Sequence, residues 1–144
     1  MPQTAKPDVA VVGAGYIGAV LSAVLADSGA SVRAVDIDED VVRAYNAGRS
    51  PVREPGLEEL IGETVRAGRL VATTDPSVVA DADVVLLTVG TPLKDDGTAD
   101  MSHIQAAVAS IAPHVRDGQL VVVKSTVPPF TTERHVAEPL RERA

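Results

Sequence analysis

The stretch Val9-Ala-Val-Val-Gly-Ala-Gly-Tyr-Ile-Gly18 decides the fold of this chain. It begins with a β-rich apolar run, after which Gly13, Gly15 and Gly18 follow with the spacing G-x-G-x-x-G. We expect the first glycine to permit a tight turn, the second to let a diphosphate approach the backbone, and the third to let a helix pack closely on the strand. The stretch therefore predicts a strand, a glycine turn and the start of a helix.

The residues that follow the turn extend this pattern. Apolar residues recur at three- and four-residue steps from Ile17, which predicts a helix with one buried stripe to about Ser28. A second β-rich run, Val32-Arg-Ala-Val-Asp36, then ends on an acidic residue. A glycine turn alone is equally typical of an ordinary strand-to-helix connection. Strand, helix and acidic residue at the expected distance together indicate dinucleotide binding.

Asp36 also distinguishes between cofactors, although an acid here could simply end the strand or cap the next helix. A carboxylate accepts hydrogen bonds from the ribose 2′-hydroxyl of NAD and repels the 2′-phosphate of NADP. The following Ile37-Asp38-Glu39-Asp40 contains no arginine that would bind this phosphate. The sequence therefore favours NAD.

Composition excludes several classes of function. The chain has 144 residues, 45% of them hydrophobic and 23% charged, which suits one globular domain. Its net charge of −7 argues against nucleic acid or an anionic membrane surface as partner. There is no cysteine, and His103, His114 and His135 are not spaced as metal ligands. With no membrane span or signal peptide in view, we expect a cytoplasmic protein without a metal.

Further along the chain, helical and strand patterns alternate. We expect helices at 38–47, 57–67, just after Asp75-Pro76, from 102 to near 113 and at 131–143, strands at 70–73, 84–89 and 120–123, and an irregular segment at 49–56. This alternation predicts an α/β Rossmann-type, doubly wound parallel sheet of order 3-2-1-4-5 with helices on both faces. Residues 1–7 are polar and contain two prolines, so we expect a flexible leader before one domain at 8–144. The sixth strand of the complete fold is missing, so we expect the chain to be the front piece of a longer protein.

Four segments, taken in order, resemble the UDP-glucose/GDP-mannose dehydrogenase family. They are Gly13-Ala-Gly-Tyr-Ile-Gly18, Asn46-Ala-Gly-Arg-Ser-Pro-Val-Arg-Glu-Pro-Gly-Leu57, Val89-Gly-Thr-Pro92 with Asp100-Met-Ser102, and Lys124-Ser-Thr-Val-Pro-Pro129. The resemblance covers nearly the whole chain from Val9 and corresponds to the family's N-terminal NAD-binding domain. It implies oxidation of the C6 hydroxyl of a nucleotide-linked sugar to a carboxylate in two NAD-dependent steps, for polysaccharide biosynthesis, by an enzyme that is a homodimer at full length.

The resemblance also implies roles for single residues. Tyr16 and Ile17 are implied to line the dinucleotide turn with the glycines, and Asp36 to hold the adenosine ribose. Glu54 is implied to lie near the substrate cleft, although an acid before Pro55 is also an ordinary turn residue.

At the other end of the cofactor, the resemblance implies contacts from two threonines. Thr91 and Thr126 are implied to lie toward the nicotinamide, with Thr126 also ordering the water that hydrolyses a thioester intermediate. Either threonine could instead be only a turn former. Lys124 could pair with a nearby carboxylate. The family's nucleophilic cysteine and its acid-base lysine and aspartate lie beyond this length, so we expect NAD binding without turnover.

Two positions depart from the family pattern. Val41 stands where the family usually has Lys or Arg, which removes one favourable charge on the adenosine side. Phe130 stands where the family usually has Gly; if that residue has a positive φ, Phe130 costs about 1 kcal/mol or forces a different loop.

Two other functions remain open from the sequence. A stand-alone NAD-responsive binding module would explain the missing cysteine. Another NAD-linked dehydrogenase, of a hydroxyacid or hydroxyacyl type, would explain the glycine turn but not the Glu-Pro-Gly-Leu and Lys-Ser-Thr-Val-Pro segments. The sugar itself is not specified by these residues, and UDP-glucose is the commonest case in the family.

Overall fold

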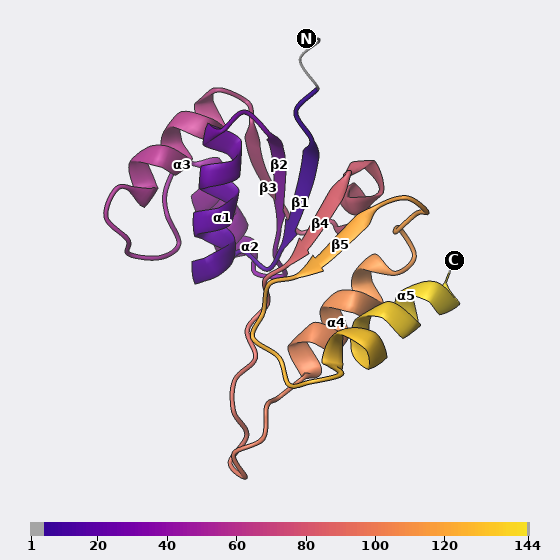
Figure 1. Cartoon of the computed structure of the whole chain (residues 1–144). Helices are drawn as coiled ribbons and strands as arrows, with labels where there is room; N and C mark the ends of the chain where they lie inside the picture. Colours follow the sequence, from indigo (N-terminus) through magenta and orange to yellow (C-terminus); the bar gives the residue numbers. More distant parts are fainter. Residues whose placement is uncertain (1–4, 144) are drawn as a thin grey trace.

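The computed structural model of this chain describes residues 5–143, which contain one parallel sheet. The strand order is β3-β2-β1-β4-β5, which confirms the predicted topology and fold class (Figure 1). The strands are β1 (Asp8–Val12), β2 (Ser31–Val35), β3 (Leu70–Thr73), β4 (Val84–Leu87) and β5 (Leu120–Val123). Residues 5–7 are exposed and belong to no helix or strand, and the rest of the predicted leader lies outside the described residues.

Helices cover both faces of this sheet. They are α1 (Tyr16–Asp27), α2 (Glu39–Asn46), α3 (Leu57–Arg66), the short 3₁₀ helix η1 (Pro76–Asp81), α4 (Ser102–Ile111), the π-helical segment η2 (Thr132–Ala137) and α5 (Glu138–Glu142). Within residues 5–143, no helix combines the length and the apolar character needed to cross a membrane. The boundaries of α1 to α4 differ from the predicted ones by one or two residues.

Alternating side chains of β1 divide the interior into two cores. Val9 and Val11 pack in one core with buried residues of α1 and α3, whereas Ala10 and Val12 pack in the other with η1 and α4. This is the period of two that a strand covered on both faces requires. Both cores are built mainly from aliphatic side chains, because the chain has only two tyrosines, one phenylalanine and no tryptophan.

β4 is shorter, and β5 more exposed, than the sequence led us to expect. The apolar run 84–89 is a strand only to Leu87, since its partner β1 ends at Val12 and Gly13 turns away with φ +101°. The last ladder bond is donated by Thr88 N–H to Val12 O at 2.9 Å. β5 lies at an edge of the sheet, as expected for a sheet that lacks its sixth strand, but its apolar residues are less buried than their pattern suggested, since Leu120 is 58% exposed.

The tail has a helical form that the sequence did not predict. The expected amphipathic helix is present, but it runs as a π-helical turn through η2 before α5 begins. Pro139 has no N–H to donate to the carbonyl of His135, which accounts for the irregular turn at this point. Val136 is buried in the core beside α4, and Leu140 packs against it.

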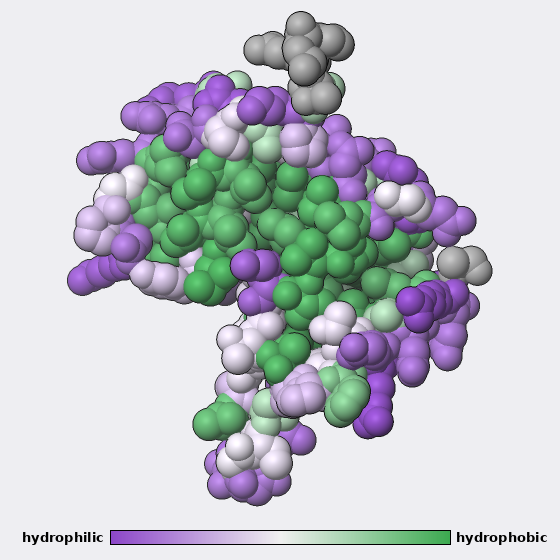
Figure 2. All heavy atoms as spheres, viewed as in Figure 1, coloured by the Kyte–Doolittle hydropathy of each residue, from purple (hydrophilic) through white to green (hydrophobic). Residues whose placement is uncertain are grey.

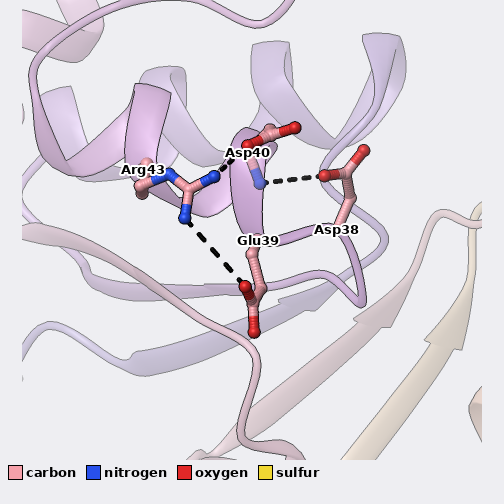
Figure 3. Close-up of polar contacts among 4 residues, drawn as sticks. All are labelled: Asp38, Glu39, Asp40 and Arg43. Carbon is pink, nitrogen blue, oxygen red and sulfur yellow. Dashed lines mark hydrogen bonds and ion pairs between the residues drawn. The ribbon is translucent and has the colours of Figure 1, made fainter.

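Local capping signals fix the start of α2. The side chain of Asp38 accepts a hydrogen bond from Asp40 N–H at 2.9 Å, as the sequence predicts for an N-cap. Arg43 reaches back along the exposed side of the helix and pairs with Glu39 and Asp40 (Figure 3). Arg43, two residues after Val41, thus pairs with carboxylates of its own helix.

The cap of η1 leads to a prediction about acid stability. Hydrogen bonds from Ser77 lower the pKa of Asp75, so the folded pKa lies below the unfolded value of about 3.9. The stabilisation is therefore complete above about pH 4 and is lost as the pH falls through the lower folded pKa. Asp75→Asn keeps a capping side chain but does not titrate. In urea denaturation at a series of pH values, we expect the stability difference between the unaltered chain and this variant to shrink toward pH 2; a constant difference would contradict the linkage.

Phe130 occupies the conformation that the family pattern suggested. Its φ is 69°, and it is the only non-glycine residue with positive φ within residues 5–143. The ring is 66% exposed, and the guanidinium of Arg134 lies 5.6 Å from its centre. The left-handed region is unfavourable for a residue with a Cβ, so the loop after β5 carries local strain.

Two substitutions at this position separate the strain from the ring contact. Phe130→Gly and Phe130→Ala both remove the contact with Arg134, but only glycine removes the Cβ. We expect the glycine variant to have a free energy of unfolding about 1 kcal/mol higher than the alanine variant. Chemical denaturation of the two proteins checks this, and equal stabilities would show that the backbone is relaxed at this position.

Candidate functional site

A cavity of about 1130 Å³ lies at the carboxyl ends of the strands. Its walls come from the glycine turn, the end of β2, the segment before α3, the loops after β4 and β5, and α4. In Figure 1 these strand ends point downward, and Figure 2 shows the surface hollowed beside the projecting loop 91–100. The predicted site residues that line the cavity are Gly13, Gly15, Tyr16, Ile17, Asp36, Glu54, Thr91 and Thr126.

The three glycines of the turn have different surroundings. At Gly13, which has φ +101°, an added Cβ would lie 2.8 Å from Val89 N. At Gly18, which does not line the cavity, it would lie 1.8 Å from the carbonyl oxygen of Gly13. At Gly15 no atom lies within 4 Å of the added Cβ. The open backbone at Gly15 therefore fits the approach of a diphosphate, while Gly18 lets α1 pack against the turn.

Asp36 connects the glycine turn with the start of α2. Its Oδ2 accepts a hydrogen bond from Ala14 N–H at 2.8 Å, and its Oδ1 accepts one from Asp38 N–H at 2.9 Å. Each carboxylate oxygen has a further lone pair, so Asp36 can still accept hydrogen bonds from ligand hydroxyls. The structure therefore holds the acid rigidly at the cavity edge with accepting capacity left.

Tyr45, in the core, is hydrogen-bonded to the glycine turn. Its hydroxyl donates a hydrogen bond of 3.1 Å to Ala14 O, inside the core. Burial, and secondarily the charge of Asp36, raise the pKa of this tyrosine well above its usual value. Tyr45 is therefore a neutral donor throughout the physiological pH range.

Tyr16 and Glu54, which are 38 residues apart, meet at the cavity wall. The Tyr16 hydroxyl donates a hydrogen bond to Oε2 of Glu54. This bond is the main cause that raises the pKa of Tyr16. The contact links the first residue of α1 to the Glu-Pro-Gly segment, a connection that the sequence did not indicate.

The loops after β4 and β5 are tied to each other on the opposite side. Thr91 Oγ1 donates a hydrogen bond to Thr126 O at 2.7 Å, and Ser125 Oγ donates one to Val89 O at 2.6 Å. Thr88 Oγ1 also donates to Gly13 O at 2.6 Å, which fixes β4 against the glycine turn. The two predicted threonines are thus brought together on one rim.

Among the cavity residues that sequence reasoning did not identify as site residues are His103, Lys124 and Ile37. His103, in the first turn of α4, has Nδ1 3.2 Å from Gly90 O. Lys124 lines the cavity, and the ion pairs found within residues 5–143 all belong to Arg43, so Lys124 is not paired there. Ile37 is 96% exposed beside Asp36. The sequence signal for these residues was their position alone. Ile37 and Lys124 come just after strands, and His103 lies in the first turn of the helix that follows a strand.

The fold and the cavity together define a class of protein. A parallel sheet with a glycine turn between β1 and α1, an acid at the end of β2 and a cavity at the carboxyl ends of the strands is a dinucleotide-binding Rossmann domain. Residues 7–144 match the sequence profile described as the UDP-glucose/GDP-mannose dehydrogenase family, NAD binding domain. The chain therefore belongs to this family, and NAD is its cofactor.

Individual relatives and solved structures agree with this assignment. A UDP-glucose 6-dehydrogenase of Pseudomonas aeruginosa is 42% identical over 125 residues, which cover 86% of this chain and 28% of the relative. The structure of a UDP-glucose dehydrogenase from Pyrobaculum islandicum superposes with a TM-score of 0.93 at 37% identity, over 100% of this chain and 34% of the other. A ternary complex of GDP-mannose dehydrogenase from Pseudomonas aeruginosa superposes with a TM-score of 0.90 at 36% identity, over 94% of this chain and 32% of the other. The chain thus spans about a third of the proteins that it matches.

Proposed function

We propose that this chain is the cofactor-binding part of an NAD-dependent nucleotide-sugar dehydrogenase, with residues 8–144 acting as one NAD-binding unit. The observation that carries the proposal is the cavity that joins the open Gly15 turn, Asp36 and the two threonine loops. Bound NAD supplies a hydride acceptor for oxidation of an alcohol. The chain's own residues bind and orient the dinucleotide.

The cavity supports a division of roles along its length. The backbone at Gly13, Gly15, Tyr16 and Ile17, at the positive end of α1, is suited to a diphosphate. The carboxylate of Asp36 is suited to the adenosine ribose and repels a 2′-phosphate.

At the nicotinamide end we assign Thr91 and Thr126, which lie on the opposite rim. Thr126 is further proposed to order the hydrolytic water, and Glu54 to face the substrate side. No nucleophilic cysteine is present among the 144 residues, so these assignments include no covalent step on this chain.

The substrate class follows from the relatives rather than from the cavity. The matched proteins are named for UDP-glucose and for GDP-mannose, so we propose a nucleotide sugar as the substrate without specifying the sugar. For the full-length enzyme we propose contacts to the sugar outside these residues, a homodimeric assembly, a cytoplasmic location and a place in polysaccharide biosynthesis.

Calorimetric titration tests the proposal. We expect NAD to bind and NADP to bind at least tenfold more weakly, because the 2′-phosphate would lie beside Asp36 and the carboxylates that follow it. Equal affinity for the two nucleotides would contradict the role of Asp36. No binding of either would contradict the proposed function.

A further inference from the structure

The segment 49–56, which we call the strap, joins α2 to α3 without regular structure. Its two ends are glycines in the left-handed region: Gly48 has φ 75° just before it, and Gly56 has φ 80° at its end. Val52 is partly buried against the core formed by α1 and α3. The strap is therefore anchored at its base and bounded by two residues that permit a change of chain direction.

The hydrogen bonds of the strap are almost all local. Within residues 5–143 its backbone bonds join Arg49 N to Ala44 O, Leu57 N to Glu54 O and Leu60 N to Gly56 O, and Ser50 bonds only to Val52. The contact from Tyr16 to Glu54 is the exception, since it reaches another part of the fold. The hydrogen bond from Tyr16 to the Glu54 carboxylate is thus the polar contact that joins the strap to a distant part of the fold; we call it the tether.

This tether lies at the diphosphate end of the cavity. Tyr16 is the first residue of α1 and directly follows Gly15, where the backbone is open. Tyr16 and Glu54 both line the cavity, and the Tyr16 side chain is only half buried. A ligand bound at the glycine turn therefore lies beside the bonded pair.

We propose that the hydrogen bond from Tyr16 to Glu54 is a latch that holds the strap beside the glycine turn and limits how fast NAD enters and leaves. Glu54 acts as a positioning residue, through Tyr16. The bond is present in the protein without ligand, and the proposal places it in the NAD-bound protein as well, so breaking it lowers the barrier to passage in both directions. The inference deepens the proposed NAD-binding function and, for its kinetic part, rests on it.

Limited proteolysis tests the latch in the absence of nucleotide. Arg49 and Arg53 are exposed on the strap, so trypsin cleavage after them measures how often the strap opens. Tyr16→Phe removes the hydroxyl and changes no strap residue, and we expect cleavage there to be about three- to tenfold faster. Ser28→Ala is the matched control, because it removes an exposed hydrogen bond at the opposite end of α1 and should leave strap cleavage unchanged. An unchanged rate in Tyr16→Phe overturns the latch.

Stopped-flow measurement of NAD binding tests the kinetic role. In Tyr16→Phe, and in Glu54→Ala, we expect the association and dissociation rate constants to rise together, by about three- to tenfold. Glu54→Gln retains an acceptor for the phenol and should restore most of the slow exchange. Faster dissociation with unchanged association would mean that the hydroxyl contacts the ligand directly, and this overturns the proposal. No NAD binding in the unaltered chain overturns the proposed function and the kinetic role with it, whereas faster cleavage with unchanged exchange overturns the kinetic role alone.

Discussion

Gly18→Ala is expected to destabilise the fold more than any other single methyl group added in the glycine turn. The new Cβ would lie 1.8 Å from the carbonyl oxygen of Gly13 and 2.9 Å from Thr88 Oγ1. Backbone atoms cannot move aside as a flexible side chain can, so α1 must shift away from β1 and β4. We expect a loss of about 3 kcal/mol or more in the free energy of unfolding, a large part of the roughly 5–15 kcal/mol of an ordinary domain. Chemical denaturation followed by circular dichroism measures this.

Gly15→Ala is the matched control for that experiment. It is also a glycine-to-alanine change in the same turn, but its Cβ meets no atom within 4 Å and its φ of −76° is not in the left-handed region. We expect it to lose much less stability than Gly18→Ala, because no atom must move, and its NAD affinity to fall because the methyl group occupies the space open to the diphosphate. If Gly18→Ala proved as stable as Gly15→Ala, the close packing of α1 on the turn would be refuted.

Asp36→Ala is expected to reduce NAD affinity about ten- to hundredfold. The change deletes hydrogen bonds from the ribose to a charged acceptor, which contribute on the order of 1.5–3 kcal/mol. It also leaves the N–H groups of Ala14 and Asp38 without their acceptor, so some stability is lost as well. Titration calorimetry at a temperature where both proteins are folded separates the two effects.

Asp36→Asn is the companion variant, since it keeps one carbonyl acceptor and removes the charge. We expect it to bind NAD with an affinity between those of the unaltered chain and Asp36→Ala, and to narrow the preference for NAD over NADP. An affinity for NAD that is the same in all three proteins would show that Asp36 serves only to tie the turn to α2.

Much of the fold could be predicted because its signals are local. Asp38 and Gly48 mark the ends of α2, and Asp75-Pro76 starts η1, through contacts within a few residues of each other. The alternation of these elements then leaves few topologies, and the sheet order followed from the right-handed crossovers. The right-handed crossover rule can be applied without knowing which side chains are in contact.

The departures from prediction depend on distant partners. The apolar run 84–89 continues past Leu87, yet the strand stops where β1 has no further residue to pair. The four apolar residues of β5 look buried in the sequence, but a strand is covered at its edge only if another strand pairs with it, and β4 is its only partner within residues 5–143. Neither fact is contained in the segment concerned.

In the candidate site, too, the features with local signals were predicted and the contacts between distant residues were not. The glycine turn and Asp36 are spaced along the chain as the binding chemistry requires, so the sequence indicated them. Tyr16 and Glu54 were each identified, but their contact depends on how the strap folds back across 38 residues. His103 reaches the cavity through the position of α4 relative to Gly90, which no local pattern specifies.

The placement of the two tyrosines gives the protein an intrinsic optical probe. With no tryptophan in the chain, ultraviolet emission comes essentially from Tyr16, half exposed at the cavity, and Tyr45, fully enclosed beneath Ala14. Tyr16 lines the cavity and Tyr45 does not, so a nucleotide bound in the cavity is expected to change mainly the Tyr16 signal. In the unlabelled chain, Tyr16 can thus report on ligand exchange at the cavity and Tyr45 on the loss of native packing in the core.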